Sequence, residues 1–261
     1  MTSEQSGGEQ PAVPRKGIQS IETGARLLDV LIESRQPLRL RELSKRSGLS
    51  PSKARMYLVS FIRTGFVAQD EASGVYRPGP KALRLGLVAL GQSGAISSAR
   101  EFVYSFGRET GYPVLLTVWD DMSPVIIESS ENRDTLPIAF RIGTRTPLWT
   151  TATGQVFLAY LPERTVDEAI ARDRPLEIKA QVHDNAQQTR DRGYAYTDSV
   201  HLTPTATLSG YGALAVPVLS PEGRLQSVIT ALVAVQPDAE APAELAERML
   251  QRISHFSQNS G

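Results

Sequence analysis

The sequence predicts an α+β protein with two domains, a small helical domain that carries a β-hairpin and a larger domain built on an antiparallel sheet. The chain has 261 residues, of which 41% are hydrophobic, a length and composition typical of a soluble globular protein with two domains. Residues 1–92 contain 14 Lys and Arg against 8 Asp and Glu, whereas residues 93–261 contain 14 against 20. Net charges of +6 and −6 therefore separate a basic first part from an acidic second part.

Residues 1–17 are rich in Ser, Gly, Gln and Pro and have no periodic apolar residues, which predicts a disordered tail. A helix then begins at Ile18. Its apolar side chains recur at helical spacing and would form a single face packed against the helices that follow: Ile21, Ala25, Leu28, Leu31 and Ile32. A short helix around Leu40 and Leu43 comes next, and Gly48 suits its exit turn because glycine tolerates positive φ.

A second helix of this pair starts directly after the turn. Ser50 is a good N-cap, Pro51 suits the first helical position and Gly65 ends the helix. One face is apolar and consists of Ala54, Leu58, Phe61 and Ile62. At about 100° per residue, the opposite face consists of Ser52, Lys53, Arg55, Met56, Val59 and Arg63. Long cations reach phosphates or guanine edges and Met56 can contact a thymine methyl group, so this face suits a DNA groove.

Residues 66–77 predict a strand, a polar turn and a second strand, a candidate wing beside the helix pair. Arg39, Arg41 and Arg77 flank the helix as candidate contacts to the DNA backbone. Charge alone would favour a solvated amphipathic helix beside an ordinary hairpin. The order of the elements, their turn residues and their charge together favour a DNA-binding domain over residues 18–78.

A linker helix is predicted over residues 79–94. Pro78 and Pro80 interrupt the chain before it, and Leu83, Leu87 and Leu90 then repeat along one side. Two interpretations of this leucine stripe stay open, since it either covers its own domain or packs against a second subunit.

The larger domain is predicted over residues 95–258. Short β-rich runs alternate with helical patterns, and hairpins flanked by helices favour an antiparallel sheet over a parallel α/β fold. The expected strands are residues 114–119, 124–129, 137–142, 213–219 and 225–235. The expected helices are residues 97–110, 150–161, 182–192 and 243–256.

Several classes of protein are disfavoured by what the sequence lacks. No apolar run is long enough to span a bilayer, and the first residues lack the apolar core of a secretory signal, so we expect a cytoplasmic protein with no membrane contact. The absence of cysteine excludes disulfides, thiolate metal sites and cysteine nucleophiles. His183, His201 and His255 have no metal-binding spacing, and nucleophile-elbow, P-loop and dinucleotide-binding patterns are missing. We therefore expect no catalytic residues, no metal and no cofactor.

From residue 18 onward, short stretches recur in a characteristic order and spacing: RSGL at 46–49, GFV at 65–67, YRPGP at 76–80, LRLG at 83–86, TATG at 151–154, RGYA at 192–195, AVPV at 215–218 and GR at 223–224. In the order and spacing of these stretches, the chain resembles the IclR family of bacterial transcriptional regulators. The resemblance implies a winged helix-turn-helix, a linker helix that makes most of the dimer contact, and a GAF-like domain that binds a small effector. It also implies dimers, or dimers of dimers, on double-stranded promoter DNA.

The resemblance further implies an effector pocket between the sheet and the turn into the helix at Thr150. There the backbone amides of Thr153, Gly154 and Gln155 would favour a ligand carboxylate at a helix N-terminus. Asp198 and Thr230 match pocket positions of the family, and three side chains are candidates to contact a ring: Trp149, Tyr196 and His201. There are alternatives to ligand contact for two of these residues. Trp149 would then be a core residue, and Thr230 would be an ordinary strand residue. Gln155 replaces a common lysine of the family.

The function expected is that of a DNA-binding regulator, most often a repressor in this family, controlled by a small organic or aromatic acid. One alternative is a small-molecule sensor whose winged helix does not bind DNA, against which Lys53, Arg55 and Arg63 argue. The other is a hydrolytic enzyme built from scattered Ser, His201 and Asp198.

Overall fold

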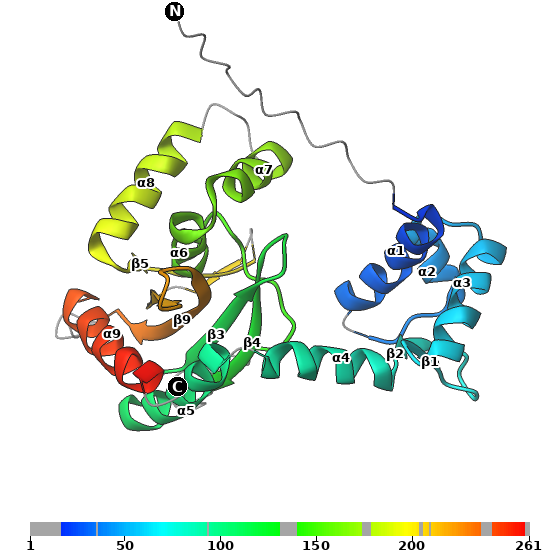
Figure 1. The fold of residues 1–261 in the computed structure, drawn as a ribbon, viewed down its shortest axis with the longest axis horizontal. Coiled ribbons are helices and arrows are strands. Elements are labelled where there is room, and N and C mark those ends of the chain that lie inside the picture. Colours follow the sequence, from blue (N-terminus) through cyan, green and yellow to red (C-terminus); the bar gives the residue numbers. More distant parts are fainter. Residues whose placement is uncertain are drawn as a thin grey trace, which may run out of the picture. The chain divides into compact units, whose positions relative to one another are not determined.

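The structure is a computed structural model that describes residues 17–34, 36–92, 94–130, 140–173, 179–203, 206–208, 210–235 and 242–258. The chain divides into two compact units between Val88 and Ala89. This division falls inside the linker predicted at residues 79–94. Figure 1 shows the elements of both units.

The first unit has the predicted order of three helices and a hairpin (Figure 1). Its elements are α1 (Gln19–Glu33), α2 (Leu40–Ser47), α3 (Pro51–Thr64), β1 (Val67–Gln69) and β2 (Tyr76–Pro78). Gly48 and Gly65 end α2 and α3 with φ of 68° and 81°, the left-handed conformation that glycine adopts without strain. The core lies between the three helices and is dominated by Leu27, Leu43 and Leu58, whose side chains are fully buried.

The inward face of α1 differs from the prediction. Ile21 and Ile32 are exposed, so the expectation that these two pack against the helix pair is wrong, and Ile18 before the helix is exposed as well. The buried face of α1 consists of Thr23, Gly24, Leu27, Val30 and Leu31. At Gly24 an added Cβ would lie 3.1 Å from the rings of Tyr57 and Phe61, so a small residue is needed for α3 to approach. Helix α1 has two apolar stripes, and periodicity alone does not say which one faces the core.

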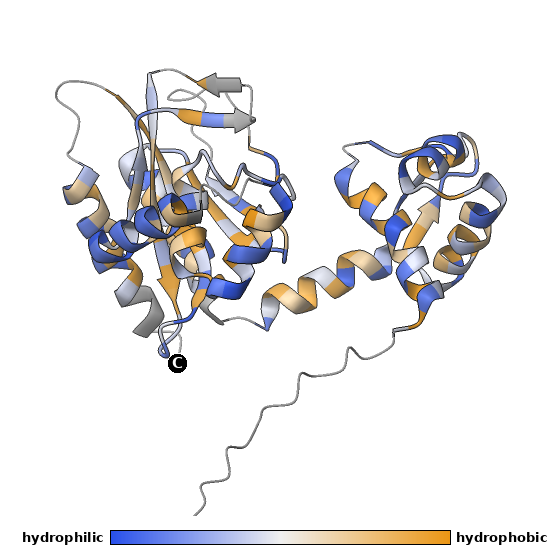
Figure 2. Ribbon diagram, turned by 90° about the horizontal axis from the view of Figure 1, so that it is seen from above, coloured by the Kyte–Doolittle hydropathy of each residue, from blue (hydrophilic) through white to orange (hydrophobic). Residues whose placement is uncertain are grey.

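Helix α4 (Pro80–Gly91) follows the hairpin, as predicted. It contains no buried residue, and Leu83, Leu85, Leu87 and Val88 are exposed. Figure 2 shows hydrophobic residues along most of its length. The exposure of Leu83 and Leu87 therefore does not support the interpretation that the leucine stripe covers its own domain.

The second unit is a three-layered α+β domain. Its five-stranded antiparallel sheet has the order β4-β3-β9-β8-β5. The strands are β3 (Val114–Trp119), β4 (Pro124–Ser130), β5 (Ala195–Thr197), β8 (Tyr211–Leu219) and β9 (Leu225–Ala234), and a separate hairpin pairs β6 (Val200–Thr203) with β7 (Ala206–Leu208). The helices are α5 (Gly94–Thr110), α6 (Ala152–Tyr160), α7 (Glu163–Asp173), α8 (Lys179–Arg192) and α9 (Pro242–Gln258).

Two hydrophobic cores lie on opposite faces of this sheet. Helices α5 and α9 cover one face, where Phe102 and Phe106 stack with ring centroids 4.9 Å apart. Helices α6 and α7 contribute Phe157 and Ile170 to the core on the other face. Figure 1 shows the two helical layers on either side of the strands. The predicted antiparallel sheet is confirmed.

Three parts of the second unit differ from the prediction. Helix α7 and the short strands β5, β6 and β7 were not expected. The three strands have only three or four residues each and give no clear periodic signal. Helix α7 does have an apolar face at helical spacing, formed by Val166, Ala169 and Ile170, which the prediction missed. Residues 137–139 of the expected third strand lie outside the described residues, and residues 140–142 are not a strand. None of the helices in the described part of the chain is long and apolar enough to cross a bilayer.

Candidate functional site

The outward face of α3 is the first candidate site, and its position follows from how the helix begins. Ser50 accepts a hydrogen bond from the Lys53 backbone amide at 3.3 Å and Pro51 occupies the first turn, so the helix starts where predicted. Ala54 and Leu58 anchor its buried face in the core. The residues predicted for DNA contact on the opposite face are all exposed: Ser52, Lys53, Arg55, Met56 and Arg63.

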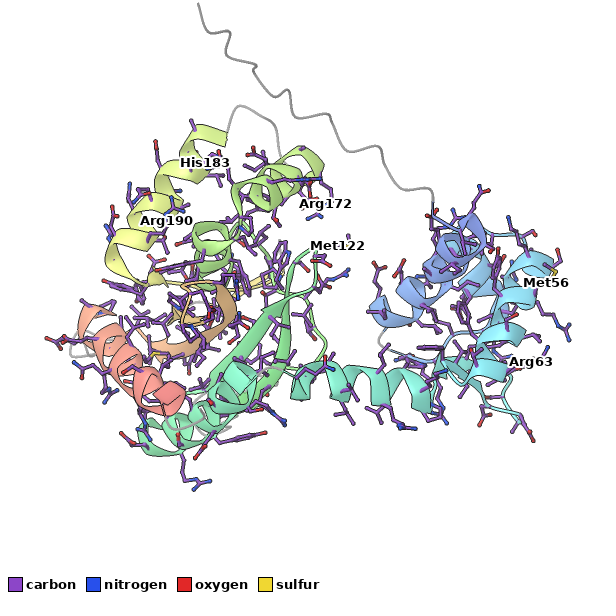
Figure 3. All side chains as sticks on the ribbon, in the orientation of Figure 1. Met56, Arg63, Met122, Arg172, His183 and Arg190 are labelled. Carbon is purple, nitrogen blue, oxygen red and sulfur yellow. The ribbon has the colours of Figure 1, made fainter. Side chains whose placement is uncertain are left out.

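Met56 and Arg63 both point away from the body of their unit in Figure 3, and the side chain of Met56 is 67% exposed. Arg39, Arg41 and Arg77 are exposed as well. Among the described residues, none of the six cations of this set forms an ion pair. These positive charges are therefore available to a polyanion.

The β1–β2 hairpin is held by a side-chain turn. One carboxylate oxygen of Asp70 accepts hydrogen bonds from the Ser73 backbone amide at 2.7 Å and from its hydroxyl at 2.6 Å. These bonds favour the ionised carboxylate, so they lower the pKa of Asp70. Gly74 completes the turn with φ of 70°. Arg77 pairs across the hairpin with Ala68 and leaves its side chain in solvent.

A pocket in the second unit is the other candidate site. It lies between the sheet, the start of α6 and the β5–β6 segment, and its cavity volume is about 30 Å³. Its apolar walls are Leu115, Phe140, Val200, Ala213 and Leu232. Its polar walls are Thr146, Thr151, Thr153, Thr197, Ser199, His201 and Thr230. Among the residues that the structure describes, no Lys, Arg, Asp or Glu lines it. His201 is the sole titratable residue of this described lining, with Nε2 3.3 Å from the Ser199 hydroxyl.

The start of α6 is capped by the side chain of Thr151. Its hydroxyl accepts from the Gly154 amide at 3.0 Å and donates to the Pro147 carbonyl at 2.6 Å, while the Gln155 amide donates to the Thr151 carbonyl at 3.0 Å. The predicted amides of Gly154 and Gln155 are thus already used within the helix. The amides of Ala152 and Thr153, at the first two helical positions, have no intrahelical acceptor.

Thr146 carries a hydroxyl that is buried in the pocket wall without a hydrogen-bond partner among the described residues. Its backbone amide donates to the Pro124 carbonyl at 2.9 Å, which holds the segment against β4. Arg145 strengthens this contact because its guanidinium donates to Asp120 at 2.8 and 3.0 Å. Beside them, Arg172 of α7 donates to the Met122 carbonyl at 2.8 Å. Figure 3 shows Met122 at the tip of the β3–β4 hairpin and Arg172 on α7.

Three of the predicted effector residues line the pocket, namely Thr153, His201 and Thr230. Tyr196 packs against the core on the opposite face of the sheet, because successive residues of a strand alternate in direction and its neighbour Thr197 faces the pocket. Asp198 is exposed, and Trp149 packs against the core beside α6. Gly154 lies so close to Leu148 that an added Cβ would overlap its carbonyl, so this glycine serves packing rather than contact across the pocket.

Sequence reasoning missed the other polar residues of the pocket, Thr146, Thr151, Thr197 and Ser199. One signal was present, since threonine recurs five times between Thr144 and Thr153. Several threonines close together at the start of a helix indicate an N-cap residue and further hydroxyl groups that can bind a ligand.

A helix-turn-helix with a hairpin and an outward basic helix face defines a DNA-binding transcriptional regulator. The family model described as IclR helix-turn-helix domain matches residues 20–71, and the model described as bacterial transcriptional regulator IclR C-terminal matches residues 88–251. The chain belongs to the IclR family of bacterial transcriptional regulators.

Curated relatives agree with this assignment. The chain is 28% identical over 220 residues to the HTH-type transcriptional regulator XynR of Escherichia coli K12, covering 82% of this chain and 85% of the relative. It is 28% identical over 207 residues to the transcriptional repressor IclR of the same strain, covering 74% and 76%. These relatives are regulators rather than enzymes, and the hydrolytic alternative is wrong.

Solved structures of similar proteins share the fold. Pseudomonas aeruginosa HmgR is 28% identical with a TM-score of 0.69, and the match covers 94% of this chain and all of that one. An IclR homologue from Microbacterium hydrocarbonoxydans, solved with 4-hydroxybenzoate, is 17% identical with a TM-score of 0.72, covering 92% and 99%. At that identity the second likeness shows the fold alone.

Proposed function

We propose that this regulator represses transcription by binding promoter DNA as a homodimer through α3, and that a small organic or aromatic acid in the pocket controls this binding. Repression is supported by relatives that carry the names transcriptional repressor IclR and acetate operon repressor. A ligand changes DNA occupancy only when it binds one arrangement of the protein better than another, and a coupling of about 1–3 kcal/mol suffices for regulation.

The single observation that carries the DNA-binding surface is the outward direction of Lys53 and Arg55, opposite the buried Ala54 and Leu58. Cations beside a small hydroxyl, Ser52, and an exposed thioether, Met56, can contact phosphates, guanine edges and thymine methyl groups. Arg39, Arg41 and Arg77 would add contacts to the backbone.

Uncharged hydrogen-bond donors in the pocket support the proposal that the effector is an acid. The amide of Thr153 lies at the positive end of a helix, and the Thr146 hydroxyl lacks a partner among the described residues, so a carboxylate would find hydrogen-bond donors on the pocket wall. Leu115, Phe140 and Leu232 provide apolar contacts for a ring or a short chain. The complex of an IclR homologue with 4-hydroxybenzoate supports the same ligand class.

The homodimer is supported by α4. Its leucines at 83, 85 and 87 are exposed, and a second subunit would remove this apolar surface from water.

A thermal-shift screen of small organic and aromatic acids, 4-hydroxybenzoate included, tests the effector proposal. We expect at least one acid to raise Tm and to change the affinity for the chain's own upstream DNA. A Thr146→Val variant should lose most of this shift and keep the Tm of the free protein. No shift with any acid, together with normal DNA binding, would contradict the effector class and leave the DNA-binding role standing.

A further inference from the structure

The segment that carries Thr146 is bonded to the edge of β4 in the way that a further strand would be. Val125 of β4 and Arg145 of this segment form an antiparallel bridge. Three main-chain hydrogen bonds join the two: from the Ile126 amide to the Thr144 carbonyl at 3.0 Å, from the Gly143 amide to the Ile126 carbonyl at 2.7 Å and from the Thr146 amide to the Pro124 carbonyl at 2.9 Å. Residues 143–146 therefore take their position from β4.

An ion pair between Arg145 and Asp120 adds a side-chain contact to these main-chain bonds. Asp120 lies in the turn between β3 and β4, and its Oδ2 accepts from Nε and Nη2 of Arg145 at 3.0 and 2.8 Å. Oδ1 of the same carboxylate accepts from the backbone amides of Met122 at 3.1 Å and Ser123 at 2.8 Å. The side chains of Arg145 and Asp120 are 35% and 28% exposed, so water screens their attraction less than on an open surface. One carboxylate thus organises the turn and anchors the segment.

The β3–β4 turn is itself held in place, which makes it a firm attachment point for Arg145. Asp121 has φ of 66°, a left-handed conformation that is uncommon for residues other than glycine. The two amide bonds to Asp120 Oδ1 support this conformation, and Arg172 of α7 donates to the Met122 carbonyl at 2.8 Å. A side chain bonded to this turn is therefore tied to both the hairpin and α7.

The hydroxyl of Thr146 explains why such support is needed. It is buried in the pocket wall and has no hydrogen-bond partner among the described residues, an arrangement that is disfavoured unless a ligand or water binds the group. No bond of its own fixes this hydroxyl, so its place depends on the bonds of the segment. A binding group that is held ready by its neighbours loses less freedom when the ligand arrives.

Attraction of an acidic effector by the charge of Arg145 is the alternative role for this residue. Two observations disfavour it. Arg145 is not part of the described lining of the pocket, and its charge is already paired with Asp120. An ion pair has no net charge, so it offers an acid little attraction over a distance.

We propose that Arg145 is a positioning residue of the effector site. Through its ion pair with Asp120 it holds the Thr146 hydroxyl where an effector carboxylate can accept its hydrogen bond, and it does not touch the effector. This inference rests on the proposed effector function and names the residue pair on which the affinity of the pocket depends.

Calorimetric titration of the full chain tests the role of the pair, with 4-hydroxybenzoate and with the acid that raises Tm most in the screen as probes. Arg145→Gln and Asp120→Asn should each raise Kd about five-fold. Asp120→Asn keeps an oxygen for the turn amides but turns an N–H group toward the guanidinium. Charge attraction predicts tighter binding by Asp120→Asn, because this variant removes a negative charge, and that result would overturn the positioning role.

Arg141→Gln is the matched control, since Arg141 is an exposed arginine that lies shortly before the same segment. Its Kd should stay within about two-fold of the wild-type value. A loss as large as that of Arg145→Gln would indicate a general effect of charge and would overturn the proposal. The Tm of each variant without acid checks that it is folded, and Arg145→Lys, which retains the charge but loses the planar fork of donors, should lie between Arg145→Gln and the wild type in affinity.

A double-mutant cycle tests whether Arg145 acts through Thr146. In the Thr146→Val background the hydroxyl is gone, so adding Arg145→Gln should change Kd by less than about two-fold. A further five-fold loss would show that Arg145 affects the effector by another route and would overturn the proposal.

Hydrogen exchange of the free protein measures the support without any ligand. The Thr146 amide should exchange faster in Arg145→Gln and Asp120→Asn than in the wild type, and unchanged exchange would overturn the claim that the pair holds the segment. The titrations separate the two proposals. Wild type that binds none of the screened acids overturns the effector class together with this inference, whereas unchanged affinity of Arg145→Gln overturns the positioning role alone.

Discussion

Thr153 and Thr230 share a hydrogen bond of 2.7 Å between their hydroxyl oxygens, although 77 residues separate them in the sequence. The bond joins the first turn of α6 to β9, and both side chains line the pocket with less than 5% of their surface exposed. The pocket floor is thus held by one buried polar contact between a helix and the central part of the sheet.

Removing one partner of this bond should destabilise the protein. Thr230→Val leaves the Thr153 hydroxyl buried and unsatisfied, which costs about 1–3 kcal/mol, and thermal unfolding should show a lower Tm. The double variant Thr153→Val with Thr230→Val removes both polar groups and should recover part of the loss. Equal stability of the single variant and the wild type would show that the bond contributes nothing.

Neutralising the cations of α3 should weaken binding to promoter DNA. For Lys53→Ala with Arg55→Ala we expect a loss of about 1–3 kcal/mol for each base contact removed and a shallower dependence of affinity on salt. Fluorescence anisotropy at several salt concentrations measures both effects. Arg164→Ala, an exposed cation of α7, is the matched control. Unchanged affinity of the double variant would remove these residues from the DNA contact.

Glycine is required at position 154 by the neighbouring backbone. An added Cβ would overlap the Leu148 carbonyl and lie 2.8 Å from the Leu148 Cα, and backbone atoms do not move aside cheaply. Gly154→Ala should therefore cost about 1–3 kcal/mol or more. Gly86→Ala on α4 meets nothing within 4 Å and should stabilise its helix by up to about 1 kcal/mol. Chemical denaturation of both variants checks the contrast, and a neutral Gly154→Ala would contradict it.

The hairpin turn should depend on pH through Asp70. Hydrogen bonds from Ser73 lower the pKa of this carboxyl from 3.8, so the ionised form stabilises the folded hairpin. The pKa of Asp70 is lower in the folded hairpin than in the unfolded chain, where it is 3.8. The stabilisation from the ionised carboxylate is therefore complete above pH 3.8 and is lost as the pH falls through the lower pKa of the folded hairpin. At neutral pH, the backbone amides of the hairpin should be better protected from hydrogen exchange in the wild type than in Asp70→Asn. This difference in protection should vanish in acid. A difference that persists in acid would assign the effect to another cause.

The helix-turn-helix was predictable because its signals are local. Ser50, Pro51 and the glycines at 48 and 65 determine where α2 ends and where α3 begins and ends, and each acts through the backbone conformation of its own turn. The exposure of Lys53 and Arg55 follows from the helical period once Ala54 and Leu58 are assigned to the core.

The pocket was less predictable because it is assembled from distant segments. Tyr196 and Thr197 are neighbours, and only the pairing of β5 with β8 decides which of them faces α6. Thr146 reaches the pocket because its segment is bonded to β4, and its amide acceptor, Pro124, is 22 residues away. No local pattern records such a contact.

By itself, the sequence determined the order of the elements, the ends of α2 and α3, the basic outward face of α3 and the antiparallel nature of the sheet. Only the tertiary structure decided that Ile18, Ile21 and Ile32 face outward and that Thr153 meets Thr230. Turns and helical periods arise from interactions within a few residues. The choice between two apolar faces of one helix, or between two faces of a sheet, depends on which other segments are close enough to bury them.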